Sequence, residues 1–405
     1  MIKTIPGGVI APKGFKAGSV HCGIKRNIKN HDIGIIFSEE SCKAAALFTT
    51  NQIVAAPIKY CRKIIQNGAV HAIVVNSGNA NACTGKKGYN DAEKMAHLTS
   101  KHLNIKSNEV IVASTGIIGR LLPMKKIQSG ISKSIAHLGN QNTHSLNIAK
   151  AIMTTDIVPK HIAVKTRLGR KEVTIGAIAK GSGMISPKMA TMFCFITTDA
   201  SISLNTLRSC IKKSVEDSFN QITIDGHMST SDMVAILANG MAHNQNITSS
   251  SKHNLTLFQK ALDYVTLHMA KAIVKDGEGA TKFVQVEINE AKSISDARKI
   301  ARMIAESPLV KTAINGEDPN WGRIISAAGY ADVTLDESRL KLFINKITIY
   351  KNGLPVTPIP KRLLSEMKKD EIKIQLHLGM GNKSTTLWTC DLSKEYVKIN
   401  AEYHT

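Results

Sequence analysis

The stretch KGSGMISPKMATMFCFITTD, residues 180–199, decides how this chain folds. Its glycine-rich start leads through Pro187 to Thr191, and residues 192–196 form an apolar run that suits a strand buried on both faces. We therefore expect a Thr hydroxyl at the entrance of a rigid, buried strand. Because Thr at the start of a strand is usually structural, these residues alone favour a packing role for Thr191 over a catalytic one.

Outside this stretch, short strand-like runs alternate with longer helical patterns. Runs of apolar or alternating residues predict strands at 71–75, 109–113, 283–288, 341–350 and 371–378. Apolar residues spaced along one face predict helices at 91–103, 205–219 (with Asn205 as N-cap) and 255–274. Three prolines and several basic residues predict an exposed connection at 355–369. The chain is expected to be α/β, with a smaller C-terminal α/β module from about residue 280.

The composition is that of an ordinary globular protein. The chain has 405 residues, of which 43% are hydrophobic and 21% charged, which excludes a disordered or collagen-like chain. Its seven cysteines form no CxxC pair and its 14 histidines no HExxH motif, so we expect neither a disulfide framework nor a metal site. Proline and glycine interrupt the first residues, and no apolar run reaches about 18 residues. We expect a soluble, cytoplasmic protein without a membrane partner.

Positive charge is concentrated in the first half of the chain. Residues 1–190 carry 27 Lys and Arg against 8 Asp and Glu, whereas residues 191–405 carry 26 against 23. A first half this basic could bind nucleic acid, attract an anionic substrate or present a lysine-rich surface. Aromatic residues make up only 4% of the chain, which weakens the nucleic-acid interpretation, and plain surface charge is favoured.

Ten segments of the chain resemble the ornithine acetyltransferase (ArgJ) family of arginine biosynthesis. They occur in the family's order and span residues 7–405: GGVIAPKGFKAG, ALFTTNQIVAAP, VVNSGNANACTG, VASTGIIG, AIMTTDIVPK, KGSGMISPKMATM, TIDGHMSTSDM, KDGEGATK, GEDPNWGRI and INAEYHT. One such segment would be a weak signal, but ten collinear ones make a chance match implausible. The resemblance implies a layered α/β sandwich of the self-processing aminopeptidase and ornithine acetyltransferase type.

The resemblance also implies an enzyme that cleaves its own Ala190–Thr191 bond and then uses Thr191 as an N-terminal nucleophile. The freed α-amine, with an ordinary pKa of about 8, could act as the base for the Thr191 hydroxyl. Cleavage would leave an α chain of residues 1–190 and a β chain of residues 191–405, and the family expectation is a heterotetramer with two of each.

The resemblance also implies site residues, each at the position of this sequence that matches the family's motif. Acetyl transfer passes through a tetrahedral oxyanion, and the resemblance assigns Thr115 and Gly116 to the oxyanion hole. From the residues alone, an ordinary turn after a strand is favoured there. By resemblance, the substrate-binding positions are Thr154, Lys180, Thr191, Glu278, Asn400 and Thr405, with Thr155 as the alternative to the first. In TIDGHMSTSDM, His227 departs from the family, which usually carries an acidic residue there.

The implied function is a ping-pong acetyl transfer. Thr191 would take the acetyl group from N2-acetyl-L-ornithine, release ornithine and pass the group to L-glutamate to give N-acetylglutamate. No metal or bound cofactor is expected, and the use of acetyl-CoA as a second donor stays open. The alternatives are a self-cleaving aminopeptidase or amidase with water as acceptor and, from another class, a basic nucleic-acid-binding protein.

Overall fold

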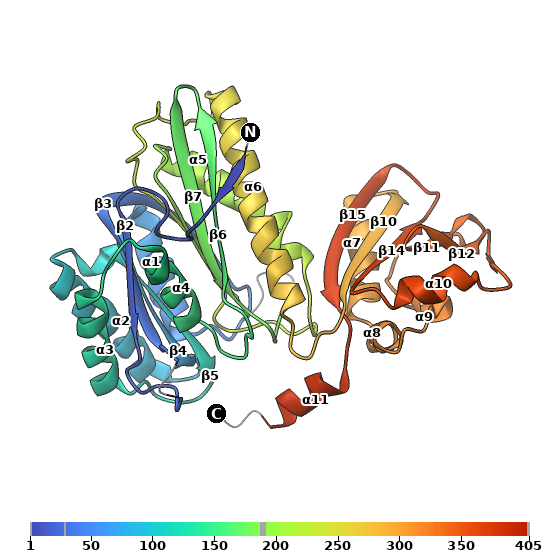
Figure 1. Cartoon of the computed structure of the whole chain (residues 1–405), viewed down its shortest axis with the longest axis horizontal. Helices are drawn as coiled ribbons and strands as arrows, with labels where there is room; N and C mark the ends of the chain where they lie inside the picture. Colours follow the sequence, from blue (N-terminus) through green and yellow to red (C-terminus); the bar gives the residue numbers. More distant parts are fainter. Residues whose placement is uncertain (1, 28–29, 187–191, 403–405) are drawn as a thin grey trace.

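The computed structural model describes residues 2–27, 30–186 and 192–402. Within these residues the strands form two separate β-sheets, one of nine strands and one of six (Figure 1). The larger sheet lies in the first part of the chain and is covered by long helices. The smaller sheet lies to the right of it in Figure 1 and has its own helices.

The larger sheet runs in the order β1-β6-β7-β8-β9-β3-β4-β5, and β2 pairs with β3. Its strands are β1 (Lys3–Ile5), β2 (Phe15–Val20), β3 (Ile33–Phe48), β4 (Ala69–Asn79), β5 (Val110–Ile117), β6 (Lys160–Leu168), β7 (Lys171–Lys180), β8 (Phe193–Thr198) and β9 (Met233–Ala238). The long β3 changes partners: its first part pairs with β2 and β4, and its last part pairs with β9. This change of partner joins the two halves of the sheet.

Helices pack on the larger sheet to give a layered arrangement. They are α1 (Ala56–Ile64), α2 (Gly85–Leu103), α3 (Met124–Ala136), α4 (Asn142–Ala151), α5 (Leu204–Glu216) and α6 (Lys252–Lys275). α1 to α4 contact β2 to β5, whereas α6 contacts β6 and β7. All six residues of β8 are buried, and successive residues belong to different apolar cores: Phe193 and Phe195 to one, Cys194 and Ile196 to the other. The predicted layered α/β class is confirmed, and the apolar run after Thr191 is the buried strand that the sequence predicts.

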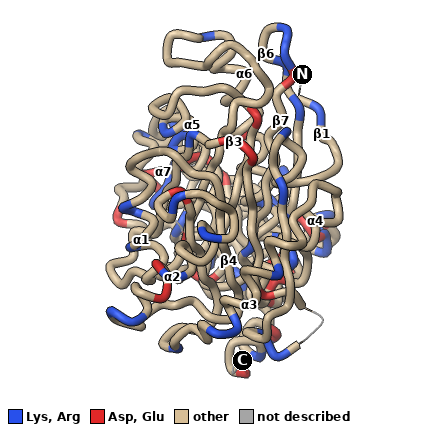
Figure 2. The backbone as a smooth tube through the Cα atoms, turned by 90° about the vertical axis from the view of Figure 1, so that its left-hand side faces the viewer, with Lys and Arg blue, Asp and Glu red and all other residues tan. Residues whose placement is uncertain are grey.

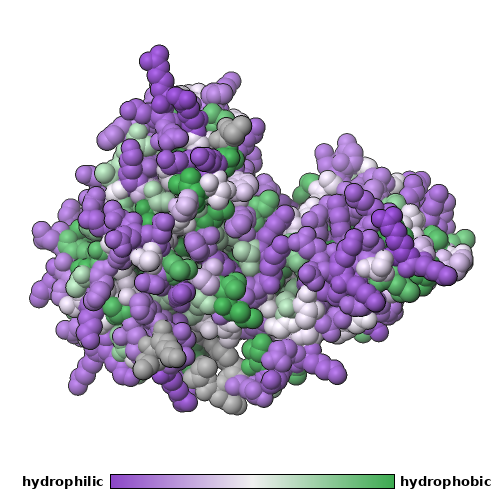
Figure 3. Space-filling view, viewed as in Figure 1, coloured by the Kyte–Doolittle hydropathy of each residue, from purple (hydrophilic) through white to green (hydrophobic). Residues whose placement is uncertain are grey.

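The smaller sheet runs in the order β13-β12-β11-β14-β10-β15 and has a separate core. Its strands are β10 (Phe283–Ala291), β11 (Lys341–Ile344), β12 (Ile347–Lys351), β13 (Leu354–Pro355), β14 (Glu371–His377) and β15 (Lys383–Cys390). The helices of this part are α7 (Ile294–Glu306), α8 (Pro308–Asn315), α9 (Trp321–Gly329), α10 (Lys361–Met367) and α11 (Lys394–Ala401). In the space-filling view this part stands out to the right of the larger one, with a notch between them (Figure 3). The division into an α chain and a β chain at residue 190 stays a prediction.

Several predicted boundaries differ from the structure. α2 begins six residues before the predicted start at 91, and Ser203 rather than Asn205 is the N-cap of α5, because Ser203 holds the extended conformation of a cap. The predicted strand at 341–350 is a hairpin, because Asn345 and Lys346 both have positive φ (45° and 69°), as a tight turn requires. The predicted connection at 355–369 contains α10. Four short 3₁₀ segments complete the elements: η1 (Ile65–Asn67), η2 (Ser107–Glu109), η3 (Phe219–Gln221) and η4 (Glu337–Arg339).

Two further features concern the surface and the helices. On the face shown in Figure 2, Lys and Arg are distributed over many elements, and some lie at the lower end next to the C-terminus. Among the described residues, no helix combines the length and the apolar character that crossing a bilayer requires.

Candidate active site

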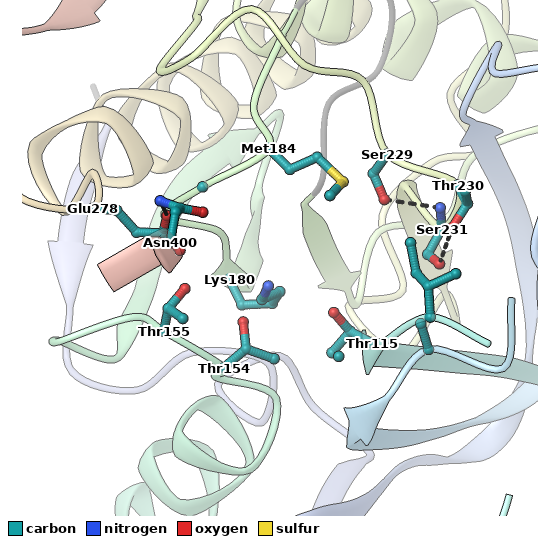
Figure 4. A pocket seen from close by; sticks show the side chains of 14 residues that line it. Thr115, Thr154, Thr155, Lys180, Met184, Ser229, Thr230, Ser231, Glu278 and Asn400 are labelled. Atoms are coloured by element: carbon teal, nitrogen blue, oxygen red, sulfur yellow. Dashed lines mark hydrogen bonds between the residues drawn. The ribbon is translucent and has the colours of Figure 1, made fainter. Parts of the chain in front are cut away.

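One cavity brings together residues from distant parts of the sequence (Figure 4). Its volume is about 130 Å³, and its lining includes six of the predicted site residues: Thr115, Gly116, Thr154, Lys180, Glu278 and Asn400. The lining is completed by Ala80, Ile118, Thr155, Gly183, Met184, Ser229, Thr230 and Ser231. We call this cavity the active-site pocket. Both Thr154 and Thr155 line it, so the structure does not separate these two alternatives.

The predicted cleavage residues Ala190 and Thr191 lie outside the described residues, as does Thr405. The described chain ends at Ser186 before them and resumes at Met192, and carboxylates from other segments bind both sides. Asp225 accepts hydrogen bonds from the backbone N–H groups of Met184 (2.6 Å) and Ile185 (2.9 Å). On the other side, the N–H of Met192 donates to Oδ1 of Asp232 (3.1 Å).

The chain around Ser186 is also joined to α7, a helix of the smaller sheet's part. The Ser186 hydroxyl donates to the carboxylate of Glu306, at the end of α7, at 3.2 Å. Thr223, two residues before Asp225, donates to the same oxygen of Glu306 at 3.2 Å. Hydrogen bonds from three separate segments therefore fix the ends of the chain on each side of residues 187–191.

Thr115 and Gly116 lie near the end of β5, where it runs parallel to β4. Gly116 pairs with Gly78 and has φ = 128°, a conformation that residues with a side chain rarely adopt. A Cβ atom at Gly116 would lie 2.4 Å from the carbonyl carbon of Gly78 and 2.5 Å from the nitrogen of Asn79. Only glycine allows this close approach of the two strands, and the approach brings the end of β5 to the pocket.

Gly116→Ala is expected to distort the pocket wall, because the added methyl group meets the backbone of Gly78 and Asn79. If Gly116 supplies the oxyanion donor that the family resemblance implies, the rate of acetyl transfer should fall by about 10²-fold. Gly119→Ala is the matched control, because Gly119 also has positive φ (84°) but a Cβ atom there would meet nothing within 4 Å. The measurement is kcat for both variants beside a thermal melt. Equal losses in both variants would contradict a role for close packing at Gly116.

Lys180 ends β7 and is buried in the wall of the pocket. Its Nζ lies 4.0 Å from Oδ2 of Asp156. The Asp156 carboxylate accepts hydrogen bonds from the N–H groups of Thr154 (3.0 Å) and Gly181 (2.7 Å), and from Lys160 Nζ at 2.7 Å. Asp156 thus connects two predicted substrate-binding segments, the one at Thr154 and the one at Lys180.

Lys160 extends this buried cluster to a third segment. Its Nζ also donates to Oδ2 of Asp276 at 2.5 Å, and the side chains of Lys160, Asp156 and Asp276 are at most 5% exposed. Asp276 lies two residues before Glu278 and directly after α6. We call Asp156, Lys160 and Asp276 the buried ion cluster, because one ammonium holds two carboxylates from distant segments that lead to residues of the pocket.

The charges of this cluster shift the pKa values of its neighbours. Burial alone would raise the pKa of Asp156, but the positive charges of Lys180 and Lys160 outweigh it and hold that pKa below its ordinary range. Burial lowers the pKa of Lys180, and the negative charge of Asp156 only partly opposes this. A carboxylate that binds beside Lys180 would stabilise its charged form, so this wall of the pocket suits an anionic group.

Glu278 and Asn400 meet at the left of the pocket in Figure 4. The Asn400 amide, on α11, donates to Oε2 of Glu278 at 2.9 Å. A Cβ atom at Gly183 would lie 2.3 Å from that same oxygen, so glycine at 183 leaves room for the carboxylate. Tyr396, also on α11, donates its hydroxyl to Asp225 at 3.2 Å. The C-terminal helix is therefore held against the pocket rather than frayed.

Reasoning from the sequence missed Asp232, which is fully buried beside the pocket. Its Oδ2 has no hydrogen-bond partner among the described residues, and burial raises its pKa well above the ordinary value for a carboxyl group. The available signal was an Asp directly before the apolar run of β9, where a charged residue is unusual. It also missed the three pocket hydroxyls of Ser229, Thr230 and Ser231, which directly precede Asp232.

The chemistry available here is therefore that of hydroxyls, amides, one ammonium and carboxylates. Among the described residues no group of three or more His, Cys, Asp or Glu side chains is placed to hold a metal ion. The pocket combines a backbone wall at Thr115 and Gly116, where the resemblance predicts an oxyanion hole, with a cationic wall at Lys180 and an anionic wall at Glu278. Such a set suits an acyl group carried by an amino acid.

Comparison with known proteins identifies the family. The model of the ArgJ family matches residues 16–405. "Arginine biosynthesis bifunctional protein ArgJ" of Staphylococcus epidermidis is 46% identical over 402 residues, which cover 99% of both chains. The protein of the same name from Thermotoga neapolitana is 47% identical, over 98% of this chain and 100% of its own.

Solved structures also match part of the chain. The Arginine biosynthesis bifunctional protein ArgJ of Bacillus halodurans is 39% identical and covers 47% of this chain and 98% of its own, with a TM-score of 0.45. The ornithine acetyltransferase of Mycobacterium tuberculosis, solved in complex with ornithine, is 34% identical over 46% of this chain and 98% of its own, with a TM-score of 0.43. On the family model and the full-length relatives, this chain is an enzyme and belongs to the ArgJ family.

Proposed function

We propose that this chain is a self-cleaving acetyltransferase of arginine biosynthesis, which moves the acetyl group from N2-acetyl-L-ornithine to L-glutamate through an acetyl ester on Thr191. The observation that carries the proposal is the convergence of six predicted site residues on one pocket. The names of its relatives, arginine biosynthesis bifunctional protein ArgJ and ornithine acetyltransferase, support the same chemistry.

Cleavage comes first in this proposal. The Thr191 hydroxyl attacks the carbonyl carbon of Ala190, a C–O bond forms as the C–N bond breaks, and the hydroxyl proton ends on the departing nitrogen. Water then hydrolyses the ester and leaves a carboxylate on Ala190 and a free amine on Thr191. The hydrogen bonds at Met184, Ile185 and Met192 support this step, because they hold the described chain in place before and after the proposed cut.

Acetyl transfer then takes place in two half-reactions. The freed amine of Thr191 accepts the proton of its own hydroxyl, and the oxygen attacks the acetyl carbonyl of acetylornithine. The C–N bond to ornithine breaks, and its nitrogen takes up the proton. Glutamate enters next, and its amine attacks the acetyl ester and restores the Thr191 hydroxyl. Thr115 and Gly116 are proposed to stabilise the oxyanion in both half-reactions.

The walls of the pocket suit the charged groups of the substrates. An ammonium at Lys180 matches an α-carboxylate, and the carboxylate of Glu278 matches an ammonium group. Thr154, Asn400 and Thr405 complete the proposed binding set. The reaction needs no metal and no bound cofactor, because the acetyl group is carried on the protein itself. We further propose a cytoplasmic heterotetramer of two α chains and two β chains.

The test is a steady-state assay of the purified protein with both substrates varied. We expect parallel lines in double-reciprocal plots and N-acetylglutamate as the product. Release of acetate without any need for glutamate would instead support the aminopeptidase or amidase alternative. Tight nucleic-acid binding that weakens steeply with salt, with no transfer of acetyl, would support the nucleic-acid alternative.

A further inference from the structure

The C-terminal helix α11 carries Asn400 to the active-site pocket without an apolar core beneath it. The structure describes all eight residues of this helix, and none of them is buried. In Figure 1 the helix lies at the bottom of the molecule, below the two sheets. Helices in proteins owe most of their stability to the packing of an apolar face. The position of α11 therefore depends largely on polar contacts.

The start of α11 is fixed against the loop that carries Glu278. The hydroxyl of Ser393, the N-cap residue of the helix, donates to the carbonyl of Gly279 at 2.6 Å. Gly279 has φ = 67°, and a Cβ atom there would lie 2.5 Å from the backbone nitrogen of Tyr396. Glycine at this position lets the helix approach the loop closely. The first turn of α11 is therefore held next to Glu278.

Tyr396 provides the contact in the middle of the helix. Its hydroxyl donates to Oδ2 of Asp225 at 3.2 Å, and the same oxygen accepts the backbone N–H of Met184. Met184 lines the active-site pocket and has φ = 58°, a conformation that residues other than glycine rarely adopt. The Asp225 carboxylate thus stabilises an unfavourable backbone conformation in the pocket wall and connects that wall to α11.

Asn400 lies one helical turn after Tyr396. Residues four apart lie on the same side of a helix, and the Asn400 amide also donates to the carbonyl of Tyr396 at 3.0 Å. The same amide donates to Oε2 of Glu278 at 2.9 Å. A displacement of Tyr396 would therefore carry Asn400 with it. A shift of about 1 Å is enough to break a hydrogen bond of this length.

We propose that Tyr396 and Asp225 are positioning residues for substrate binding, because their hydrogen bond holds α11 where Asn400 meets an amino acid in the active-site pocket. This inference rests on the proposed function and adds two residues to its binding machinery. Apparent affinity is the intrinsic affinity multiplied by the fraction of molecules in the arrangement that binds. Loss of the hydrogen bond lowers this fraction, so it weakens binding and leaves the chemical step unchanged.

The experiment compares Tyr396→Phe with the wild type, since this change removes one oxygen atom and keeps the ring. We expect KM for acetylornithine and for glutamate, and the calorimetric Kd for L-ornithine, to rise about 10-fold, equivalent to the loss of one hydrogen bond to a charged group. kcat should stay within about 2-fold, because only binding changes. Amide hydrogen exchange in residues 394–401 should become faster, because α11 leaves the pocket more often.

Tyr350→Phe is the matched control. Tyr350, on β12, also donates its hydroxyl to a carboxylate, that of Glu337 at 2.7 Å. It lies in the core of the smaller sheet's part and does not line the active-site pocket. This variant loses the same kind of hydrogen bond, so its KM and Kd values should equal those of the wild type.

Combining Tyr396→Phe with Asn400→Ala tests whether Tyr396 acts through Asn400. The combined rise in KM should be smaller than the product of the two single rises, because both changes remove the same contact. A full product, a fall in kcat at constant KM, or an equal rise in KM in Tyr350→Phe would overturn the inference.

Ornithine binding separates this inference from the proposed function. Unchanged Kd and KM in Tyr396→Phe, with full acetyl transfer by the wild type, would overturn the inference and leave the proposed function intact. A 10-fold rise in Kd for ornithine, with no acetyl transfer by the wild type, would support the role of Tyr396 in binding an amino acid and show that the proposed transfer fails.

Discussion

Thr191→Ala is expected to remain one uncut chain of 43.9 kDa and to lose acetyl transfer by at least about 10³-fold. The substitution removes the only atom proposed both to cleave the Ala190–Thr191 bond and to carry the acetyl group. The measurements are a denaturing gel, N-terminal sequencing and an acetyl-transfer assay. For the wild type we expect two bands and a new N-terminus that begins Thr-Met-Phe-Cys.

Thr191→Ser is the matched control for this result. It keeps the hydroxyl and removes only a methyl group, so we expect cleavage and transfer to persist at reduced rates. The Ala variant should melt at a temperature close to that of the wild type, because β8 and its partners remain in place. Acetyl-enzyme formed by Thr191→Ala, or an uncut wild type with full activity, would contradict the assignment of the nucleophile.

Lys160→Met is expected to destabilise the protein by about 3–5 kcal/mol, because it leaves two buried carboxylates without their shared ammonium. The carboxylates belong to Asp156 and Asp276, which are at most 5% exposed. Their repulsion should separate the segments that carry Thr154 and Glu278, so KM for acetylornithine should rise together with the loss of stability. Urea denaturation and steady-state kinetics measure the two effects.

Lys165→Met provides the comparison for the buried ion cluster. Lys165 pairs with Glu172 at 3.1 Å, but the two side chains are 40% and 66% exposed. An exposed pair of this kind contributes about 0–1 kcal/mol, so the urea midpoint should change little and KM not at all. If Lys160→Met and Lys165→Met lowered the free energy of unfolding equally, burial would not explain the contribution of the cluster to stability.

The sequence predicted the class of fold well because alternating apolar patterns are local. The buried strand after Thr191 and the amphipathic helix at 255–274 are both present, with small shifts at their ends. The ends of the helices were predicted less well, because they depend on single residues such as Ser203. The repeat of apolar residues does not reveal which residue caps α5. The hairpin at Asn345 was missed for the same reason.

The site was predictable only through the family resemblance. Taken by themselves, Thr115 and Gly116 suggested an ordinary turn after a strand. The carboxylates at Asp156, Asp232 and Asp276 could not be found in this way, because their importance comes from burial and from partners far away in the sequence. Contacts of that kind appear only once the sheet order is known.

The order of the larger sheet has a consequence for how the molecule is made. β8 and β9, which follow the proposed cut, lie between β7 and β3, which precede it. Neither piece alone could complete the sheet, so the whole precursor must fold before it is cut. After the cut, refolding from denaturant changes from a unimolecular to a bimolecular reaction, and its yield should depend on protein concentration. The cleaved enzyme would then owe its structure to a connection that it no longer has.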